Sequence, residues 1–208
     1  LLEMAGGSSE RDGILSAQSL ATIFNLMRPD DLVFNHVLSG WLMGEDPPVF
    51  DILAWSVDGT NLPATLHRQF LEVFRENLLC RDAEMTVLGS PVRLGAIDVP
   101  TFVTGAVTDH LTPWTGCYRT VGLLSGPTTF VLSNAGHIAS LVNPPGNPKA
   151  SYYAGGPTDG DAQTWLDGST KHMGSWWEEW ADWILPLSGP ARTAPAAMGS
   201  DAHPALTD

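Results

Sequence analysis

Two polar residues each follow a short β-forming run, and together they could perform acyl-transfer chemistry. Asp109 comes shortly after the run 100–105, and His137 comes shortly after the run 128–132. In a nucleophile–histidine–acid triad the histidine takes a proton from the nucleophile, and the carboxylate fixes the tautomer of the imidazole. The two positions are 28 residues apart, which leaves room for one helix and one strand. We therefore predict that Asp109 and His137 are the catalytic acid and base of a triad.

The sequence does not supply the nucleophile in its usual form. A serine or cysteine nucleophile commonly stands in a sharp turn of the form G-x-S-x-G or G-x-C-x-G. Neither pentapeptide occurs before Asp109. Cys80 and Cys117 fall in amphipathic or helix-like segments, and we interpret both as small buried hydrophobic side chains. A nucleophilic role for either one is the alternative, which the missing turn disfavours.

The elements that must position the acid and the histidine form one predicted βαβ unit. The runs 100–105 and 128–132 indicate parallel core strands, with a helix over 113–124 between them and a right-handed crossover. The carboxyl ends of both strands then meet at one edge of the sheet, where ligand sites of α/β proteins form. A carboxylate oxygen of Asp109 is expected within hydrogen-bonding distance of a ring nitrogen of His137.

Residues 16–79 are predicted to be mostly helical. Apolar residues recur with helical spacing in a first helix that Pro29 ends. A second helix is expected from Asp30 as its N-cap to Gly44 as its stop. A third helix is expected to begin near residues 60–61, with Pro63 in its first turn.

Two further features flank the predicted βαβ unit. Before it, a hairpin is expected over 86–88 and 92–94. After it, a long loop rich in Gly, Pro and Asn begins at Asn143. Ser175 followed by Glu178 then forms a capping-box pattern, which predicts the start of a helix. The tryptophans of this helix are expected to pack against the sheet, with a stacking platform for a ligand as the alternative.

These elements indicate an α/β fold with a helical cap region, and the family resemblance given below implies the C-terminal portion of an α/β-hydrolase fold. Helices inserted between a nucleophile strand and an acid strand would cover such a site and control entry to it. The predicted organisation is a partial helical cap region at 1–80, the C-terminal half of an α/β-hydrolase core at 81–188, and a flexible tail at 189–208.

Several segments resemble, in order, the C-terminal catalytic portion of polyhydroxyalkanoate synthases. The matching segments are 26–35, 44–55, 108–114, 133–138, 143–149 and the closing 174–177. In that family the nucleophile is a cysteine in a lipase-like box upstream of the matched region. The resemblance therefore implies that this chain is a fragment of an acyltransferase, inactive by itself, that polymerises (R)-3-hydroxyacyl-CoA with release of coenzyme A.

The resemblance also implies roles for single residues. His137 would activate the upstream cysteine and then the incoming hydroxyl, while Asp109 would support the imidazole and help to activate the 3-hydroxyl of the substrate. Arg28 is a candidate to bind a phosphate of coenzyme A through its planar donor fork, and a salt bridge to a neighbouring acid is the alternative. His110 is a candidate substrate-binding residue, and shaping of the loop through a bond to a backbone carbonyl is its alternative role.

Composition excludes several classes of partner. The net charge is −13 with only 10 Lys and Arg residues, which disfavours nucleic acid and anionic membrane surfaces. No apolar run approaches the ~18 residues of a membrane span. Two cysteines without paired spacing fit a reducing cytoplasm. His36, His67, His172 and His203 lack ligand spacing, so we expect neither a metal nor another cofactor, with a coenzyme A thioester serving as substrate.

The partners that the resemblance implies are the (R)-3-hydroxyacyl-CoA, the growing polyester chain, a second copy in a homodimer and the surface of polymer granules in the cytoplasm. Two alternatives stay open at this point. One is a Ser-type esterase or depolymerase of the same fold. The other is a non-catalytic relic that binds granules or a synthase.

Overall fold

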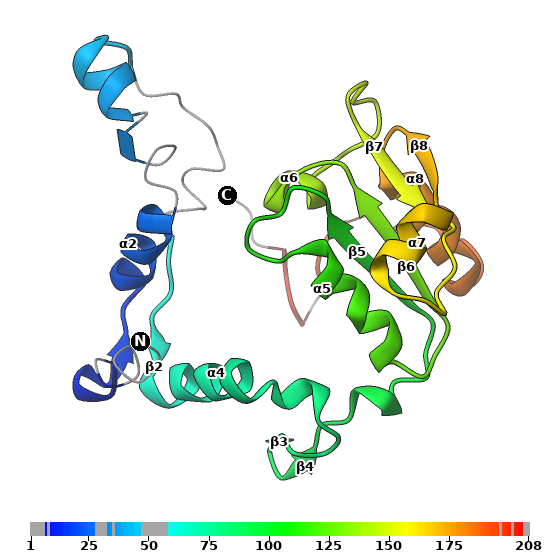
Figure 1. The fold of residues 1–208 in the computed structure, drawn as a ribbon, viewed down its shortest axis with the longest axis horizontal. Coiled ribbons are helices and arrows are strands. Elements are labelled where there is room, and N and C mark those ends of the chain that lie inside the picture. The colour runs from blue at the N-terminus through cyan, green and yellow to red at the C-terminus, as the bar shows by residue number, and fades with distance from the viewer. Residues whose placement is uncertain are drawn as a thin grey trace. The chain divides into compact units, whose positions relative to one another are not determined.

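A computed structural model describes residues 7, 9–27, 33–34, 36–46, 58–195, 197–200 and 202–205. The chain divides into two compact units, Leu1–Arg93 and Leu94–Asp208, and each is described by itself (Figure 1). Helices and strands alternate along the described residues, which agrees with the predicted α/β class.

The described residues of the first unit are mostly helical and include two short antiparallel strand pairs. Its elements are β1 (Ile14–Leu15), α2 (Ala17–Met27), a π-helical segment (Val37–Leu42), β2 (Leu62–Pro63), α4 (Ala64–Glu76), a 3₁₀ turn (Leu78–Cys80), β3 (Thr86–Val87) and β4 (Ser90–Pro91). Strand β1 pairs antiparallel with β2, and β3 pairs antiparallel with β4.

The first unit corrects several details of the sequence prediction. The third helix begins at Ala64 rather than near 60–61, because Leu62 and Pro63 are extended and pair with β1. In the predicted hairpin, Leu88 and Gly89 form the turn with positive φ angles of 49° and 81°, so Ser90–Pro91 is the second strand rather than 92–94.

The other predictions for the first unit are met in part. Gly44, the predicted stop of the second helix, has a φ of +70° and donates its N–H to the carbonyl of Gly40. The predicted start of that helix at Asp30 lies outside the described residues, as does Pro29. Cys80 is exposed, so its interpretation as a buried side chain is wrong.

The second unit contains a four-stranded sheet. Its strands and helices are β5 (Thr101–Ala106), α5 (Trp114–Arg119), β6 (Thr128–Ser133), α6 (His137–Leu141), β7 (Ser151–Ala154), α7 (Ala162–Gly168), β8 (Thr170–Met173) and α8 (Trp176–Ile184), with 3₁₀ turns at Leu94–Ala96, Thr120–Leu123 and Leu185–Leu187. The strand order is β5-β6-β7-β8, so among the described residues β5 forms one edge of the sheet. Strands β5 and β6 are parallel, whereas β7 and β8 each run antiparallel to the preceding strand.

The predicted βαβ unit is confirmed, but the sequence prediction missed the rest of the sheet. Strands β7 and β8 and helix α7 occupy part of the segment after Asn143 that was predicted to be loop. Asn134 joins this segment to the end of β6, since its side-chain amide donates to the carbonyl of Lys149 and its side-chain oxygen accepts the N–H of Ser151. The N-cap of α8 is at Ser175, as predicted, and the Ser175 hydroxyl oxygen accepts the N–H of Trp177.

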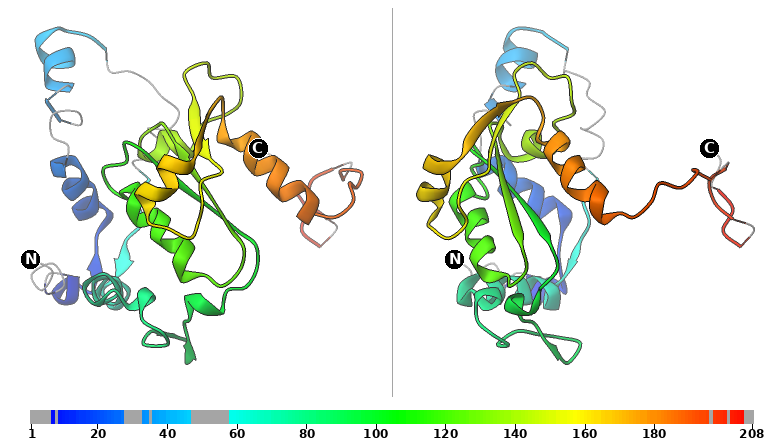
Figure 2. Two further views of the ribbon diagram at one scale, coloured as in Figure 1. Left: turned by 45° about the vertical axis from the view of Figure 1, so that its right-hand side comes forward. Right: turned by 90° about the vertical axis from the view of Figure 1, so that its right-hand side faces the viewer.

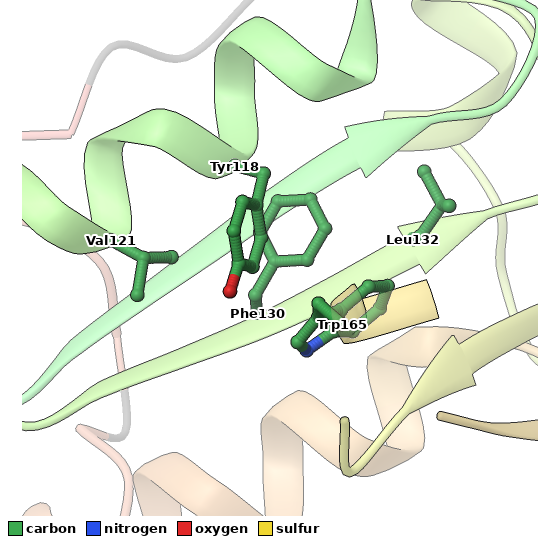
Figure 3. Close-up of a cluster of buried hydrophobic side chains, with 5 residues drawn as sticks. All are labelled: Tyr118, Val121, Phe130, Leu132 and Trp165. Atoms are coloured by element: carbon green, nitrogen blue, oxygen red, sulfur yellow. The ribbon is translucent and has the colours of Figure 1, made fainter. Parts of the chain in front are cut away.

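The sheet is covered on both faces, as the right-hand view of Figure 2 shows. On one face, α5 and α7 enclose an apolar cluster in which the ring of Phe130 meets Tyr118 and Trp165 edge-on, at centroid distances of 5.2 and 4.7 Å (Figure 3). Val121 and Leu132 complete this cluster. On the other face, Trp176 of α8 packs in a second cluster with residues of β6 and β7. Burial on both faces fixes the strand register that positions the loops beyond them.

Candidate active site

The loops after β5 and β6 lie side by side because these two strands are parallel and in register. Ala106, the last residue of β5, pairs with Ser133, the last residue of β6. The pairing continues beyond the strands, since the N–H of Val107 donates to the carbonyl of Ser133 at 2.9 Å. Asp109 and His137 therefore meet, and Nδ1 of His137 lies 2.8 Å from Oδ2 of Asp109. An ionised carboxylate only accepts hydrogen bonds, so Nδ1 carries the proton.

The carboxylate of Asp109 is held by its own loop as well as by His137. Its Oδ1 accepts the backbone N–H groups of Leu111 and Thr112 at 2.8 and 2.9 Å, and its Oδ2 accepts the hydroxyl of Thr112 at 2.7 Å. The side chain is only 6% exposed. Burial alone raises the pKa of Asp109, but the hydrogen bonds from Thr112, His137 and Leu111 outweigh it and hold the pKa well below its usual range. Asp109 is therefore a carboxylate at neutral pH.

His137 presents one side of its ring to the acid, and the ring is partly exposed. It is the first residue of α6, and its side chain is 40% exposed. Because Nδ1 faces Asp109, the opposite nitrogen Nε2 is free to exchange a proton with a nucleophile or a hydroxyl. The exposed ring of His110 lies edge-on to His137, with the centroids 6.5 Å apart. The structure thus brings three of the four predicted site residues together.

A small cavity of about 90 Å³ opens beside the acid and the histidine. It is lined by residues of β5, of the Asp109 loop, of α5 and of α6, namely Thr104, Gly105, Ala106, Asp109, Thr112, Cys117, His137, Ser140 and Leu141. Sequence reasoning did not single out Thr112 or Ser140. The spacing Asp-x-x-Thr, in which a side chain can bond the turn that it begins, was the available signal for Thr112.

Cys117 lines this cavity, but its environment is unlike that of an activated nucleophile. Burial, and after it the charge of Asp109, raises the pKa of the Cys117 thiol. The sulfur donates weakly to the carbonyl of Thr112 at 3.8 Å. Hydrogen bonding with the side chain of Thr112 and with the backbone at Cys117 lowers the pKa and only partly offsets the increase. A thiol with a raised pKa forms little of the reactive thiolate near neutral pH.

The remaining site predictions concern metals, membranes and Arg28. Arg28 lies outside the described residues. In the described part of the chain, no group of three or more His, Cys, Asp or Glu residues could hold a metal ion. Among the same residues, no helix combines the length and apolar character needed to cross a membrane.

Comparison with known proteins yields matches along nearly the whole chain, although no family model matches it. Poly(3-hydroxyalkanoate) polymerase 1 of Ectopseudomonas oleovorans is 41% identical over 204 residues, which are 98% of this chain and 36% of that protein. Polymerase 2 of the same organism is 41% identical over 99% of this chain and 37% of its own length. The polymerase subunit PhaC of Cupriavidus necator is 38% identical over 98% of this chain and 35% of its own.

The chain therefore spans about a third of the length of these relatives. The motifs identified in the sequence fall within a match that extends along almost all of its 208 residues. This chain belongs by sequence to the poly(3-hydroxyalkanoate) polymerase family.

Proposed function

We propose that this chain supplies the acid and the histidine of an acyltransferase that polymerises (R)-3-hydroxyacyl-CoA and releases coenzyme A. The observation that supports the proposal best is the hydrogen bond of 2.8 Å between Nδ1 of His137 and the buried carboxylate of Asp109. This contact leaves Nε2 of a partly exposed imidazole available for proton transfer, beside a small cavity. The relatives, which are polymerases by name, supply the substrate class.

In the proposed reaction, the nucleophile is a cysteine upstream of the region that matches this chain. Nε2 of His137 takes the proton of the thiol, and the thiolate attacks the thioester carbonyl. The bond to the coenzyme A sulfur breaks, and this sulfur takes the proton from the imidazolium to leave as free coenzyme A. Asp109 stabilises the imidazolium between the two proton transfers.

Chain growth uses the same base a second time. His137 accepts the proton of a 3-hydroxyl group, whose oxygen attacks the acyl group on the cysteine. An ester bond forms, and the cysteine leaves as a thiol after receiving the proton from His137. His110, whose exposed ring lies beside His137, is a candidate to contact the substrate in this step. Arg28 is a candidate to bind a phosphate of coenzyme A.

The larger assembly in this proposal is an α/β-hydrolase domain. Residues 81–188 would be its C-terminal half, residues 1–80 a part of its helical cap, and residues 189–208 a flexible tail. The complete enzyme would act as a homodimer at the surface of polymer granules in the cytoplasm. The parallel strands β5 and β6, which deliver both site loops to one edge of the sheet, support this assignment.

A chimera tests the proposal. The region of the E. oleovorans polymerase 1 that matches this chain is replaced by this chain, and release of coenzyme A from 3-hydroxyacyl-CoA is followed with a thiol reagent. We expect the chimera to polymerise. Asp109→Ala and His137→Ala should each reduce kcat by about 10²-fold or more. The control His203→Gln changes an exposed residue and should match the parent chimera.

The separate 208-residue chain provides the complementary measurement. Because it has no nucleophile turn, we expect it to release no coenzyme A. If the separate chain does release coenzyme A, and if Cys80→Ala or Cys117→Ala abolishes this release, the proposal of an upstream nucleophile is contradicted. A folded chimera in which His137→Ala keeps full activity would contradict the role of the histidine.

A further inference from the structure

The helix that carries His137 is too short to be stable by itself. Helix α6 comprises only the five residues His137–Leu141. Isolated helices of this length do not persist in water, because nucleation is costly and the last carbonyl groups have no partner within the helix. The orientation of His137 therefore depends on groups outside α6 that bind these carbonyls.

Three consecutive residues at the start of α8 supply such groups. The indole N–H of Trp176 donates to the carbonyl of Ser140 at 2.6 Å, and the indole N–H of Trp177 donates to the carbonyl of Leu141 at 2.9 Å. The hydroxyl of Ser175 donates to the carbonyl of Asn143, which follows α6. The donors and acceptors lie 32 to 36 residues apart in the sequence.

The donors are fixed by the core of the sheet. Trp176 is only 9% exposed, and its ring stacks on Phe102 of β5 with the centroids 6.1 Å apart. Val131 of β6 belongs to the same buried cluster. Within α6, the hydroxyl of Ser140 donates to the carbonyl of His137, the first residue of the helix, at 2.8 Å. A continuous set of contacts thus leads from β5 and β6 through Trp176 to the backbone of His137.

We propose that Trp176 and Trp177 are positioning residues for His137, acting through the carbonyl groups at the end of α6. Neither Trp176 nor Trp177 is among the residues that line the cavity beside Asp109 and His137. Each fixes a carbonyl in the last turn of α6, so that Nδ1 of His137 stays within reach of Asp109. The catalytic importance of this positioning rests on the proposed function, whereas the positioning itself does not.

The test removes the two indole N–H donors and keeps an aromatic ring at each position. Trp176→Phe and Trp177→Phe are compared with Trp183→Phe in the isotopically labelled chain. Trp183 packs against the same Phe102 ring at 5.4 Å, yet the described residues provide no hydrogen-bond partner for its indole nitrogen. NMR measures how fast the Nδ1 proton of His137 exchanges with water, and urea unfolding reports the stability of each variant.

We expect the exchange of this proton to be about two- to tenfold faster in Trp176→Phe and in Trp177→Phe, since each loses one hydrogen bond that restrains α6. Trp183→Phe should match the parent chain after correction for stability. Parent-like exchange in both folded Trp176→Phe and Trp177→Phe would overturn the proposal, as would an equal acceleration in Trp183→Phe. If Trp176→Phe does not fold, the partly exposed Trp177 decides the outcome.

Kinetics of the chimera then separate positioning from catalysis. The same two variants should lower kcat with little change in KM, because they loosen the base without touching bound substrate. Faster proton exchange together with an unchanged kcat would leave the positioning role intact and would count against the catalytic role of His137. Unchanged proton exchange with a lowered kcat would overturn the positioning role instead.

Discussion

The Asp109 carboxylate uses both of its oxygens before any substrate is involved. Oδ1 is occupied by two backbone N–H groups, and Oδ2 is shared between the hydroxyl of Thr112 and the imidazole of His137. The loop alone therefore fixes the plane of the carboxylate, and the histidine approaches an acceptor that is already oriented. Such preorganisation reduces the rearrangement that must accompany each proton transfer.

The lowered pKa of Asp109 predicts a specific pH dependence of stability. Its pKa in the folded chain is below the unfolded value of about 3.9, so its contribution to stability is present above that pH and is lost as the pH falls towards the folded value. We expect the free energy of unfolding to fall less steeply below about pH 4 in Asp109→Asn than in the parent chain. Urea titrations at several pH values measure this slope.

Asp98→Asn is the matched control for this experiment, because Asp98 is an exposed aspartate of the same unit. Its slope should follow that of the parent chain. If Asp109→Asn also keeps the parental slope, the hydrogen bonds to the carboxylate do not stabilise its charged form, and the electrostatic description of the site fails.

At the scale of elements, a close backbone approach at the amino ends of β5 and β6 fixes the βαβ unit. The N–H groups of Ser125 and Gly126 both donate to the carbonyl of Ile97 at 3.1 Å. A Cβ atom at Gly126 would lie 2.5 Å from the carbonyl carbon and oxygen of Asp98. Only glycine fits there without a shift of the backbone, because backbone atoms cannot turn aside as a side chain can.

Gly126→Ala should therefore lower the free energy of unfolding by about 1–3 kcal/mol, the usual cost of overpacking. Gly116→Ala is the control, since a Cβ there meets nothing within 4 Å and alanine favours a helix interior. Chemical denaturation of both variants measures the difference. A Gly126→Ala variant as stable as Gly116→Ala would show that the two segments are not packed as closely as described.

Which elements the sequence predicts depends on how each is stabilised. Strands β5 and β6 are runs of mostly β-forming residues that are buried or partly buried along their whole length, and such strands are recognisable from sequence. Strand β7 has the four residues Ser151–Ala154 inside a Gly- and Pro-rich stretch, and its pairing depends on the distant side chain of Asn134. A local pattern cannot reveal an element whose partner is set by tertiary contacts.

The same reasoning applies to the site. The positions of Asp109 and His137 after parallel strands predicted their contact, because strand topology alone brings those loops together. The contributions of Trp176 and Trp177 were not predictable beyond packing. Their indole N–H groups donate to backbone carbonyl groups of α6. Every residue has a backbone carbonyl, so the sequence does not indicate which carbonyl a distant tryptophan binds.

At the scale of the whole molecule, charge is the dominant property. The net charge is −13, and a substrate with several phosphates would be repelled by the average field of the chain. Under the proposed function, binding of coenzyme A thioesters would require a local group that overcomes this repulsion. Arg28 is one of only 10 Lys and Arg residues, and it is the candidate that the sequence singles out.

In the chimera, Arg28→Ala should raise KM for the acyl-CoA severalfold and leave kcat nearly unchanged, since a phosphate contact far from the reacting carbonyl is mostly uniform binding. Arg75→Ala is the matched control, because Arg75 is exposed and pairs with Glu76 on α4. Steady-state kinetics at several salt concentrations measure both constants. Equal KM values for the two variants would assign Arg28 to an ion pair instead of a phosphate contact.

The edge position of β5 bears on where the nucleophile of the proposed triad would enter the site. Within the described residues β5 pairs only with β6, so the hydrogen-bonding groups along its other side offer a template for one more strand. A strand that joins there in parallel orientation ends at the same border of the sheet as Asp109 and His137. Its closing loop would be delivered next to the imidazole by backbone pairing alone. Under the proposed function, the upstream cysteine that His137 serves would arrive on such a neighbouring strand.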